Sequence, residues 1–340
     1  MLIQPLARSR ADQRRFVDRS RETETIMRAV ANSAPTLLLG ERGSGRTTLL
    51  NRVAWLLERE SEPRDTVLVP GELAQDPAQL LGVLVARLQR LADPGRSRAG
   101  WIEDLRALSM PDGPFGNVAQ PAILMELIDL LGERLAELER PVCLMVDGIA
   151  PAVAHRVFGS LRNELWTLQG ASWVVAGDSA AERLYLEPPA DAFFERILRL
   201  GPFTDADAAK LLRAHAPDLS AAQIRQAVAA AGGNPRRLLR AAGDLQAGIS
   251  PARAAADGLA DEAAALAGPL ARSVVVYLAA YGPAAASDAA MLRDIGASRQ
   301  RASQLMHKLE SAGLLETIEQ SQPGRRGRPP RRFALNAVHE

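Results

Sequence analysis

The chain has 340 residues, a length that suits two or three domains of typical size. Hydrophobic residues make up 47% of the chain and charged residues 24%, which excludes a disordered, collagen-like or coiled-coil protein. With 41 basic and 40 acidic side chains the formal net charge is +1, so a uniformly basic nucleic-acid coat is excluded and a local basic patch is not. The single cysteine, Cys143, excludes a disulfide framework and a cysteine-based zinc site.

The N-terminal part of the chain alternates between two kinds of segment. Short apolar runs that end in turn residues predict buried strands at 36–39, 66–69, 142–146, 172–176 and 197–200. Amphipathic runs predict helices at 20–32, 46–60, 76–92 and 121–139. Strands that alternate with helices predict an α/β core whose parallel sheet is covered on both faces.

The pattern changes after the last of these strands. Three helices without an intervening strand are predicted at 204–216, 220–231 and 235–247, and the Ala/Gly-rich segment 241–268 predicts a linker or a loosely packed helix. From about residue 263 a new unit begins with a helix up to Tyr281. A short helix from Ser287, a longer one over 298–312, a strand at 314–315 and a last strand at 333–335 follow.

The hydropathy pattern does not suggest a membrane protein. The N-terminal segment lacks the apolar region of a secretory signal, and no apolar run reaches the roughly 18 residues of a membrane span. We therefore expect a soluble, cytoplasmic protein without a membrane partner.

Residues 40–47 form a glycine-rich loop that fits G-x-x-x-x-G-K-[ST], except that Arg46 replaces the lysine. The loop follows an apolar strand and opens a helix, which is the context that this motif requires. Backbone N–H groups of such a loop and of the helix N-terminus bind phosphate oxygens, and the Thr47 hydroxyl is a ligand for Mg²⁺. We predict a site for ATP or ADP with Mg²⁺ formed by Gly40, Gly43, Ser44, Gly45, Arg46, Thr47 and Thr48. The alternative is a plain turn; a dinucleotide fingerprint fits less well, because Thr48 stands where a third glycine is expected.

Asp147 ends the apolar strand 142–146 and is predicted to hold the Mg²⁺ together with Thr47. Gly148 follows it, at a position where many such ATPases carry the glutamate that polarises the attacking water. A guanidinium is broader than the ammonium of lysine, so Arg46 and Gly148 both favour nucleotide binding over efficient hydrolysis. The protein is then an ATPase at most, and a genuine motor would have to take its carboxylate from Glu41 or Glu164.

These motifs resemble those of the AAA+ and STAND P-loop ATPases, especially the origin-recognition and initiator-like proteins with a C-terminal winged helix. Two further segments carry the resemblance: Phe16-Val17-Asp18-Arg19 and Gly233-Asn234-Pro235-Arg236. The resemblance implies that Val17 lies near the adenine and that Arg236 reaches the γ-phosphate. It also implies a catalytic pair, Asp147 and Asp178, with Asp178 at the end of the next core strand; a plain strand-to-turn junction explains Asp178 equally well.

The helix predicted at 298–312 has two contrasting faces. Ala302, Leu305, Met306 and Leu309 recur with helical spacing and predict a buried stripe. With the shorter helix before it, this segment is typical of a helix-turn-helix whose second helix enters the major groove. The segment 321–333 holds five arginines and no acid, which suits a wing on the phosphate backbone or in the minor groove. The predicted DNA-binding residues are Ser298, Arg299, Gln300, Arg301, Ser303, Gln304, His307, Arg325, Arg326, Arg328 and Arg331.

The expected architecture is an α/β P-loop core with a parallel sheet (1–202), an all-α lid (203–262) and a winged helix-turn-helix domain (263–340). The expected function is a nucleotide-gated switch on double-stranded DNA with weak or no hydrolysis. Two alternatives stay open: a non-hydrolysing scaffold that recruits a protein partner to DNA, and an ATPase motor that acts as a homo-oligomer. In the scaffold, the winged helix could serve protein contact instead of DNA.

Overall fold

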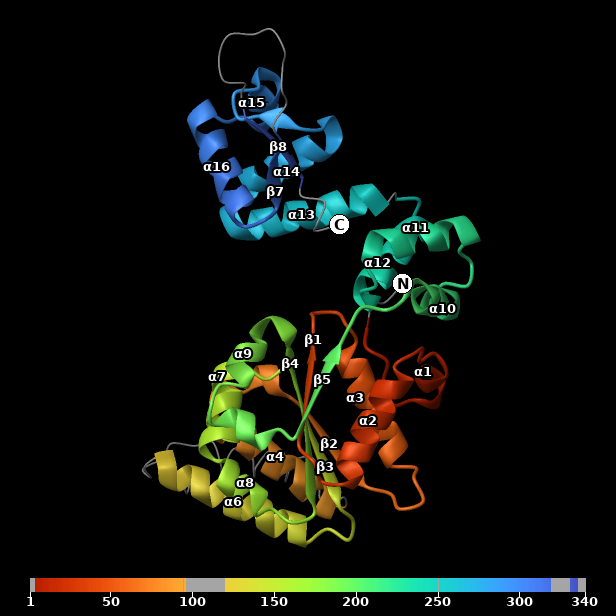
Figure 1. The fold of residues 1–340 in the computed structure, drawn as a ribbon, viewed down its shortest axis with the longest axis vertical. Coiled ribbons are helices and arrows are strands. Elements are labelled where there is room, and N and C mark those ends of the chain that lie inside the picture. Colours follow the sequence, from red (N-terminus) through yellow and green to blue (C-terminus); the bar gives the residue numbers. More distant parts are fainter. Residues whose placement is uncertain (1–3, 94, 96–119, 250, 319–330, 336–340) are drawn as a thin grey trace. The chain divides into compact units, whose positions relative to one another are not determined.

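A computed structural model of the chain describes residues 4–93, 95, 120–249, 251–318 and 331–335. The chain forms two compact units, one of residues 2–202 and one that begins at Phe203 (Figure 1). Within the described residues, none of the helices combines the length and the apolar character that crossing a membrane requires.

A five-stranded parallel sheet forms the centre of the first unit, with the strand order β2-β3-β4-β1-β5. All five predicted strands are confirmed, and their bounds are β1 (Thr36–Gly40), β2 (Asp65–Pro70), β3 (Val142–Asp147), β4 (Ala171–Asp178) and β5 (Arg196–Leu200). The register pairs Gly40 with Asp178, and Asp147 with Ala176. The carboxyl ends of β1, β3 and β4 therefore meet at one edge of the sheet.

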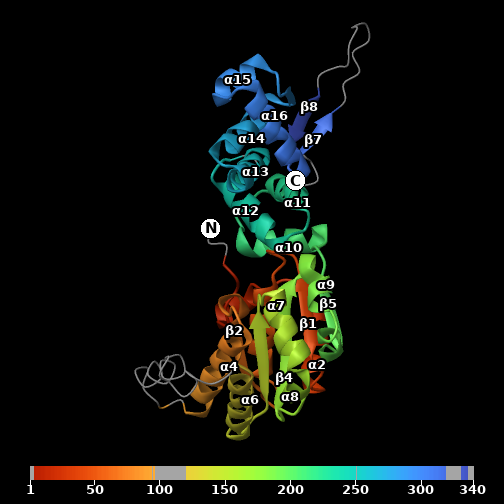
Figure 2. The ribbon, with the colours of Figure 1, turned by 90° about the vertical axis from the view of Figure 1, so that its left-hand side faces the viewer.

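Helices cover both faces of this sheet, because side chains along each strand point alternately to opposite faces. Leu38 packs on one face with α2 (Ser20–Ala31) and α3 (Arg46–Leu57), through residues such as Ile26 and Val53. Leu37 and Leu39 pack on the other face. That face is covered by α4 (Pro77–Ala92), α6 (Gln120–Ala136), α7 (Pro151–Ala154), the π-helical turn η2 (His155–Ser160) and α8 (Arg162–Trp166), of which Figure 2 labels the four α-helices. Shorter elements complete the unit: α1 (Arg10–Arg14), η1 (Gly71–Leu73), η3 (Ser179–Ala181), α9 (Glu182–Tyr185) and η4 (Ala190–Phe193).

Gly177, near the end of β4, faces the buried ring of Tyr185. A Cβ atom at Gly177 would lie 2.5 Å from two atoms of that ring. The ring is held in place because Tyr185 Oη donates a hydrogen bond of 2.6 Å to the carbonyl oxygen of Ile149. The glycine is therefore required by the packing of α9 on β4.

We expect Gly177→Ala to lower the free energy of unfolding of the first unit by about 1–3 kcal/mol, the usual cost of overpacking a core. All four tryptophans lie within residues 2–202, so urea denaturation followed by tryptophan fluorescence reports on this unit alone. Gly82→Ala is the matched control, because Gly82 lies inside α4 and a Cβ there meets nothing within 4 Å. Equal urea midpoints for Gly177→Ala and the wild type would contradict the described packing.

The second unit begins with the three predicted helices, which are confirmed as α10 (Asp205–His215), α11 (Ala221–Ala231) and α12 (Pro235–Gln246). Each begins at a capping side chain, from Thr204, Ser220 and Asn234 respectively. These oxygens satisfy backbone N–H groups of the first turn and so fix where each helix starts.

The next helix corrects two predictions. The segment predicted as a linker or loosely packed helix contains α13 (Pro251–Ala267), whose Ala260 and Ala263 are fully buried in the C-terminal core. The single helix predicted from 263 to Tyr281 is wrong. It is interrupted at Gly268, which has φ +85°, and α14 (Pro269–Tyr281) starts anew with proline in its first turn. The predicted domain limit at 262 falls inside α13 and stays a prediction.

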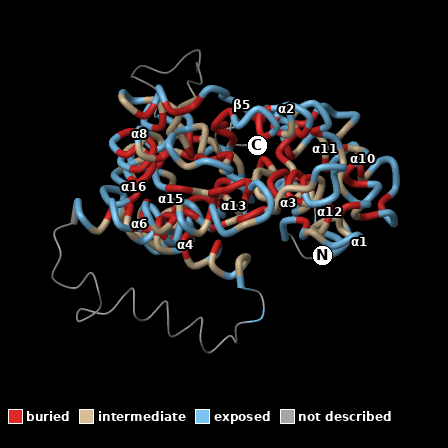
Figure 3. The backbone as a smooth tube through the Cα atoms, turned by 90° about the horizontal axis from the view of Figure 1, so that it is seen from below, coloured by how far each residue is buried: buried red, intermediate tan, exposed pale blue. Residues whose placement is uncertain are grey.

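The C-terminal elements have the order and pairing of a winged helix-turn-helix. They are α14, β6 (Ala284–Ala285), α15 (Ala289–Ile295), α16 (Arg299–Ser311), β7 (Leu315–Ile318) and β8 (Arg332–Leu335). The three strands form an antiparallel sheet in the order β6-β8-β7. The predicted stripe of α16, Ala302, Leu305, Met306 and Leu309, is buried against this sheet's Phe333 and against α14. Buried and exposed residues alternate along many of the helices, as expected for helices that pack with one face on a core (Figure 3).

Candidate nucleotide site and nucleic-acid interface

The glycine-rich loop connects Gly40, the last residue of β1, to Arg46, the first residue of α3. Gly43 and Gly45 have φ values of +89° and +96°, in the left-handed region that favours glycine. A Cβ atom at Gly40 would lie 2.5 Å from Ser44 Oγ and 3.2 Å from Leu200 Cβ. The path of the loop therefore explains all three glycines.

The start of α3 offers donors for an anion. Its N-cap residue is Gly45, and among the described residues no side chain caps this end. The N–H groups of a first helical turn then remain for a ligand, and the helix dipole favours negative charge there. The Arg46 atom Nη1 is buried and has no hydrogen-bond partner within the described chain. A buried, unpaired guanidinium nitrogen beside such N–H groups suits phosphate oxygens.

The fold brings Thr47 and Asp147, the two predicted Mg²⁺ ligands, into contact. Thr47 Oγ1 donates a hydrogen bond of 2.5 Å to Asp147 Oδ2, although the residues are 100 positions apart in sequence. Burial raises the pKa of the Asp147 carboxyl above its ordinary value, and the charge of Glu72 adds to this, while the Thr47 hydrogen bond and the charge of Arg46 act in the opposite direction. A cation beside this carboxylate would relieve the cost of its buried charge.

A hydroxyl and a carboxylate are oxygen donors of the kind that Mg²⁺ prefers. The described residues contain no group of three or more His, Cys, Asp or Glu side chains that could hold a metal by themselves. The pair Thr47 and Asp147 therefore fits a Mg²⁺ ion that completes its coordination with phosphate oxygens and water.

Two other predicted residues already have hydrogen-bond partners. Thr48 Oγ1 accepts a 3.3 Å hydrogen bond from the backbone N–H of Leu6. Asp178 lies beside Gly40 in the sheet, as the resemblance implies, and its Oδ1 accepts the N–H of Ala180 at 3.0 Å, which caps η3. Contact of Thr48 with a phosphate, and a catalytic role for Asp178, stay predictions.

The N-terminal segment runs along α3. The carbonyl oxygen of Leu6 accepts a hydrogen bond of 3.0 Å from Asn51 Nδ2. Arg8 Nη1 contacts Glu58 Oε1 at 2.8 Å, beyond the last residue of α3, and Thr66 Oγ1 of β2 at 2.7 Å. These contacts, with the one from Leu6 to Thr48, hold residues 6–8 against the helix that starts at the glycine-rich loop.

Glu164 is excluded as a carboxylate for hydrolysis. It lies in α8, which leads into Ala171, the first residue of β4. The start of β4 lies at the edge of the parallel sheet opposite to Asp147, because Ala171 pairs with Val142 and Asp147 pairs with Ala176. Glu41 is exposed within the glycine-rich loop itself.

The segment Phe16 to Arg19 links the beginning of the first unit to its last residues in sequence. Val17 is half-buried, and Asp18 and Arg19 both have φ +60°. Arg19, which the sequence indicated only as part of this segment and without a role, is buried and donates to Glu22 Oε1 at 2.8 Å and to the carbonyl oxygen of Gly201 at 2.5 Å. The spacing of Arg19 and Glu22, one helical turn apart, was the available signal.

Arg236 belongs to the second unit. Asn234 Oδ1 accepts the N–H groups of Arg236 and Arg237, at 3.0 and 3.3 Å, and so starts α12. The Arg236 side chain is exposed. Its contact with a γ-phosphate stays a prediction.

The outer face of α16 carries the predicted DNA-binding side chains. Ser298, Arg299, Gln300, Arg301, Gln304 and His307 are exposed, and Ser303 is half-buried. Two of them also have structural roles: Ser298 Oγ accepts the N–H of Arg301 at 3.3 Å, and His307 Nδ1 lies 3.2 Å from Glu310 Oε2. Arg331 is exposed before β8, whereas Arg325, Arg326 and Arg328 lie outside the described residues.

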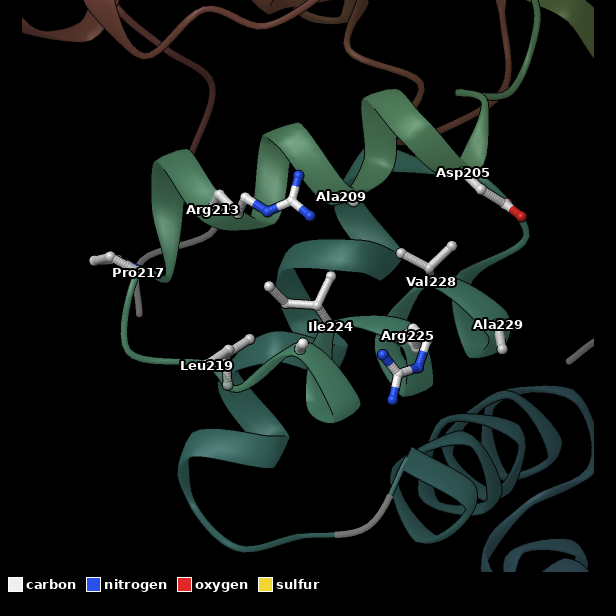
Figure 4. Close-up of a pocket in the computed structure, with 10 residues that line it drawn as sticks. Asp205, Ala209, Arg213, Pro217, Leu219, Ile224, Arg225, Val228 and Ala229 are labelled. Atoms are coloured by element: carbon white, nitrogen blue, oxygen red, sulfur yellow. The ribbon is translucent and has the colours of Figure 1, made fainter.

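A separate pocket of about 700 Å³ lies between α10 and α11 (Figure 4). Apolar side chains such as Leu219, Ile224 and Val228 line it, and Arg213 and Arg225 stand at its margin. No residue predicted for nucleotide or DNA binding lines this pocket.

The sheet order and the glycine-rich loop define an α/β P-loop fold, and the chain shares its fold with a solved origin-recognition protein. The Orc1 protein of Aeropyrum pernix, in complex with DNA, has 17% identity and a TM-score of 0.51, over 95% of this chain and 90% of that one. Cdc6p of Pyrobaculum aerophilum has 15% identity and a TM-score of 0.45, over 94% and 92%. The RuvB Holliday junction branch migration motor of Thermotoga maritima has 14% identity and a TM-score of 0.44, over 93% of both. No protein-family model and no curated protein sequence matches the chain.

Proposed function

We propose that the protein binds ATP or ADP with Mg²⁺ in the glycine-rich loop and binds double-stranded DNA through α16 and the wing. The observation that carries the proposal is the contact of Thr47 with Asp147 beside the buried, unpaired Arg46 Nη1. Its fold likeness to an Orc1 protein described in complex with DNA supports the DNA-binding half. Val17 is assigned to the adenine, and Arg236 to the γ-phosphate.

Nucleotide acts as a gate in this proposal. Arg236 belongs to the same compact unit as the winged helix. ATP has a γ-phosphate that Arg236 would contact and ADP has none, so the two nucleotides would favour different conformations of the protein. The chain then works as a switch on DNA in the cytoplasm.

The test measures the binding of ATP and of ADP, with and without Mg²⁺, and the affinity for duplex DNA in each state. We expect Mg²⁺-dependent binding and DNA affinities that differ about 10-fold between ATP and ADP, within the usual range of coupling between sites. The absence of any nucleotide binding would overturn the proposal.

A second candidate function is a scaffold that recruits a protein partner to DNA. Arg46 in place of lysine and Gly148 after Asp147 favour it, because both weaken the case for turnover. Nucleotide binding with equal DNA affinity in the ATP and ADP states would select the scaffold over the switch.

A further inference from the structure

Gly148 leaves the position after Asp147 without a side chain, and Glu72 takes up the space. A Cβ atom at Gly148 would lie 2.7 Å from Glu72 Cγ and 2.8 Å from Glu72 Oε1. The carboxylate of Glu72 therefore stands where a side chain of residue 148 would extend, at the edge of the sheet where β3 ends with Asp147.

Strand pairing and two glycines bring Glu72 to this place. β2 pairs with β3 up to Pro70 opposite Asp147, and η1 follows at once. A Cβ atom at Gly71 would lie 2.8 Å from Ile149 Cα and 2.9 Å from Ile149 N, so the backbone of η1 touches the backbone that follows β3. Gly148 has φ +73°, which lets that backbone turn away beneath Glu72.

The electrostatics agree with this placement. Burial is the main reason why the pKa of Asp147 is raised, and the charge of Glu72 is a further cause in the same direction. Glu72 itself is exposed to water, whereas the neighbouring Gly71 is buried. A carboxylate that is open to water, at the sheet edge that carries the predicted Mg²⁺ ligand, is placed where a general base for hydrolysis could take a proton from water.

We propose that Glu72, supplied by the turn η1 that follows the neighbouring strand β2, replaces the missing glutamate after Asp147 and is the general base of a slow ATPase. This inference rests on the proposed nucleotide site. Glu72 accepts one proton from a water molecule while the oxygen of that water forms a bond to the γ-phosphorus. The bond between that phosphorus and the β–γ bridging oxygen breaks, ADP takes the bonding electron pair, and Glu72 returns the proton to solvent with release of phosphate. ATP and water are the only reactants.

The experiment compares phosphate release and nucleotide affinity in full-length wild type and Glu72→Gln, with Mg²⁺ and duplex DNA present. Gln keeps the size of the side chain and removes the base, so we expect kcat to fall roughly 100-fold or more. The Kd for ATP should change by less than about threefold, since the base contributes mainly in the transition state. Glu62→Gln is the matched control with unchanged kcat, because Glu62 is exposed before the start of β2, at the opposite edge.

A second variant tests the placement of the carboxylate with its chemistry intact. Gly148→Ala puts a methyl carbon 2.7 Å from Glu72 Cγ and 2.8 Å from Glu72 Oε1, too close for contact, so Glu72 must move and kcat should fall. Because φ at residue 148 is +73°, alanine also strains the backbone, and thermal melting checks that the variant folds. ATP binding without phosphate release in the wild type, or unchanged kcat in Glu72→Gln, overturns the role of Glu72 and leaves the nucleotide site standing. Loss of turnover in Glu41→Gln with retention in Glu72→Gln assigns the base to Glu41 instead. No nucleotide binding in the wild type would end both proposals together.

Discussion

Asp147→Asn should weaken the binding of Mg²⁺-ATP by roughly 100-fold, because Mg²⁺ in such sites depends on one or two protein carboxylates in addition to phosphate. Asn keeps an oxygen that accepts the Thr47 hydrogen bond, so the local fold should survive. The measurement is a titration with ATP at saturating Mg²⁺ and again with the metal chelated. In the wild type the two affinities should differ widely, and in the variant they should nearly coincide.

Asp129→Asn provides the control, since Asp129 is an exposed carboxylate on α6. Retention of full Mg²⁺ dependence by Asp147→Asn would show that the ion takes its protein ligands from elsewhere.

The same substitution should have the opposite effect on the nucleotide-free protein. The pKa of Asp147 is raised in the folded state, mainly by burial, so the folded chain binds a proton more tightly than the unfolded chain does. Its stability therefore falls as the pH rises from the unfolded pKa to the folded pKa, and the penalty remains above that range. Asp147→Asn removes the penalty, so the variant should melt above the wild type at neutral pH. The difference should vanish as the pH approaches about 4, the ordinary pKa of an aspartate.

Arg299→Ala combined with Arg301→Ala should weaken binding to duplex DNA by roughly 100-fold, because each charge-assisted contact that is lost contributes about 1.5 kcal/mol. Both side chains are exposed at the start of α16, the helix whose position in the domain corresponds to the recognition helix. Phosphate contacts also release counterions, so the slope of log affinity against log salt concentration should decrease by about two. Titrations of one duplex at several salt concentrations measure both quantities.

The control removes the same charge from another part of the same unit. Arg213→Ala with Arg225→Ala takes two arginines from α10 and α11, at the margin of the pocket in Figure 4. An equal loss of affinity in both double variants would mean that net charge, and not α16, determines DNA binding.

Much of this fold follows from local pattern. Runs such as Leu37–Leu39 and the apolar stripe on α16 have one dominant explanation, so the strands of the sheet and the helix α16 were predicted closely. Alanine is found in cores, on surfaces and in linkers alike, so an alanine-rich segment does not predict a core helix. Only the structure shows that Ala260 and Ala263 of α13 are buried in the same core as α14. Likewise, no local signal marks Glu72, because its position depends on strand pairing with β3 and on the contact of Gly71 with Ile149.

Thr47 and Asp147 could be predicted as ligands of one Mg²⁺ ion because each follows a recognisable apolar strand. The parallel sheet brings the ends of these two strands together, and the two side chains are in contact. The additional hydrogen bonds of Thr48 and Asp178 could not be predicted, since a hydroxyl and a carboxylate serve equally well as ligands and as caps.

The contacts of residues 6–8 with α3 make the N-terminal segment a strap along the helix that follows the glycine-rich loop. One anchor is Thr48, in the first turn of α3, and the other is Glu58 at its far end. Any ligand that displaces the start of α3 must stretch or release this strap. Cleavage by a protease within this segment would therefore report whether the start of α3 has moved.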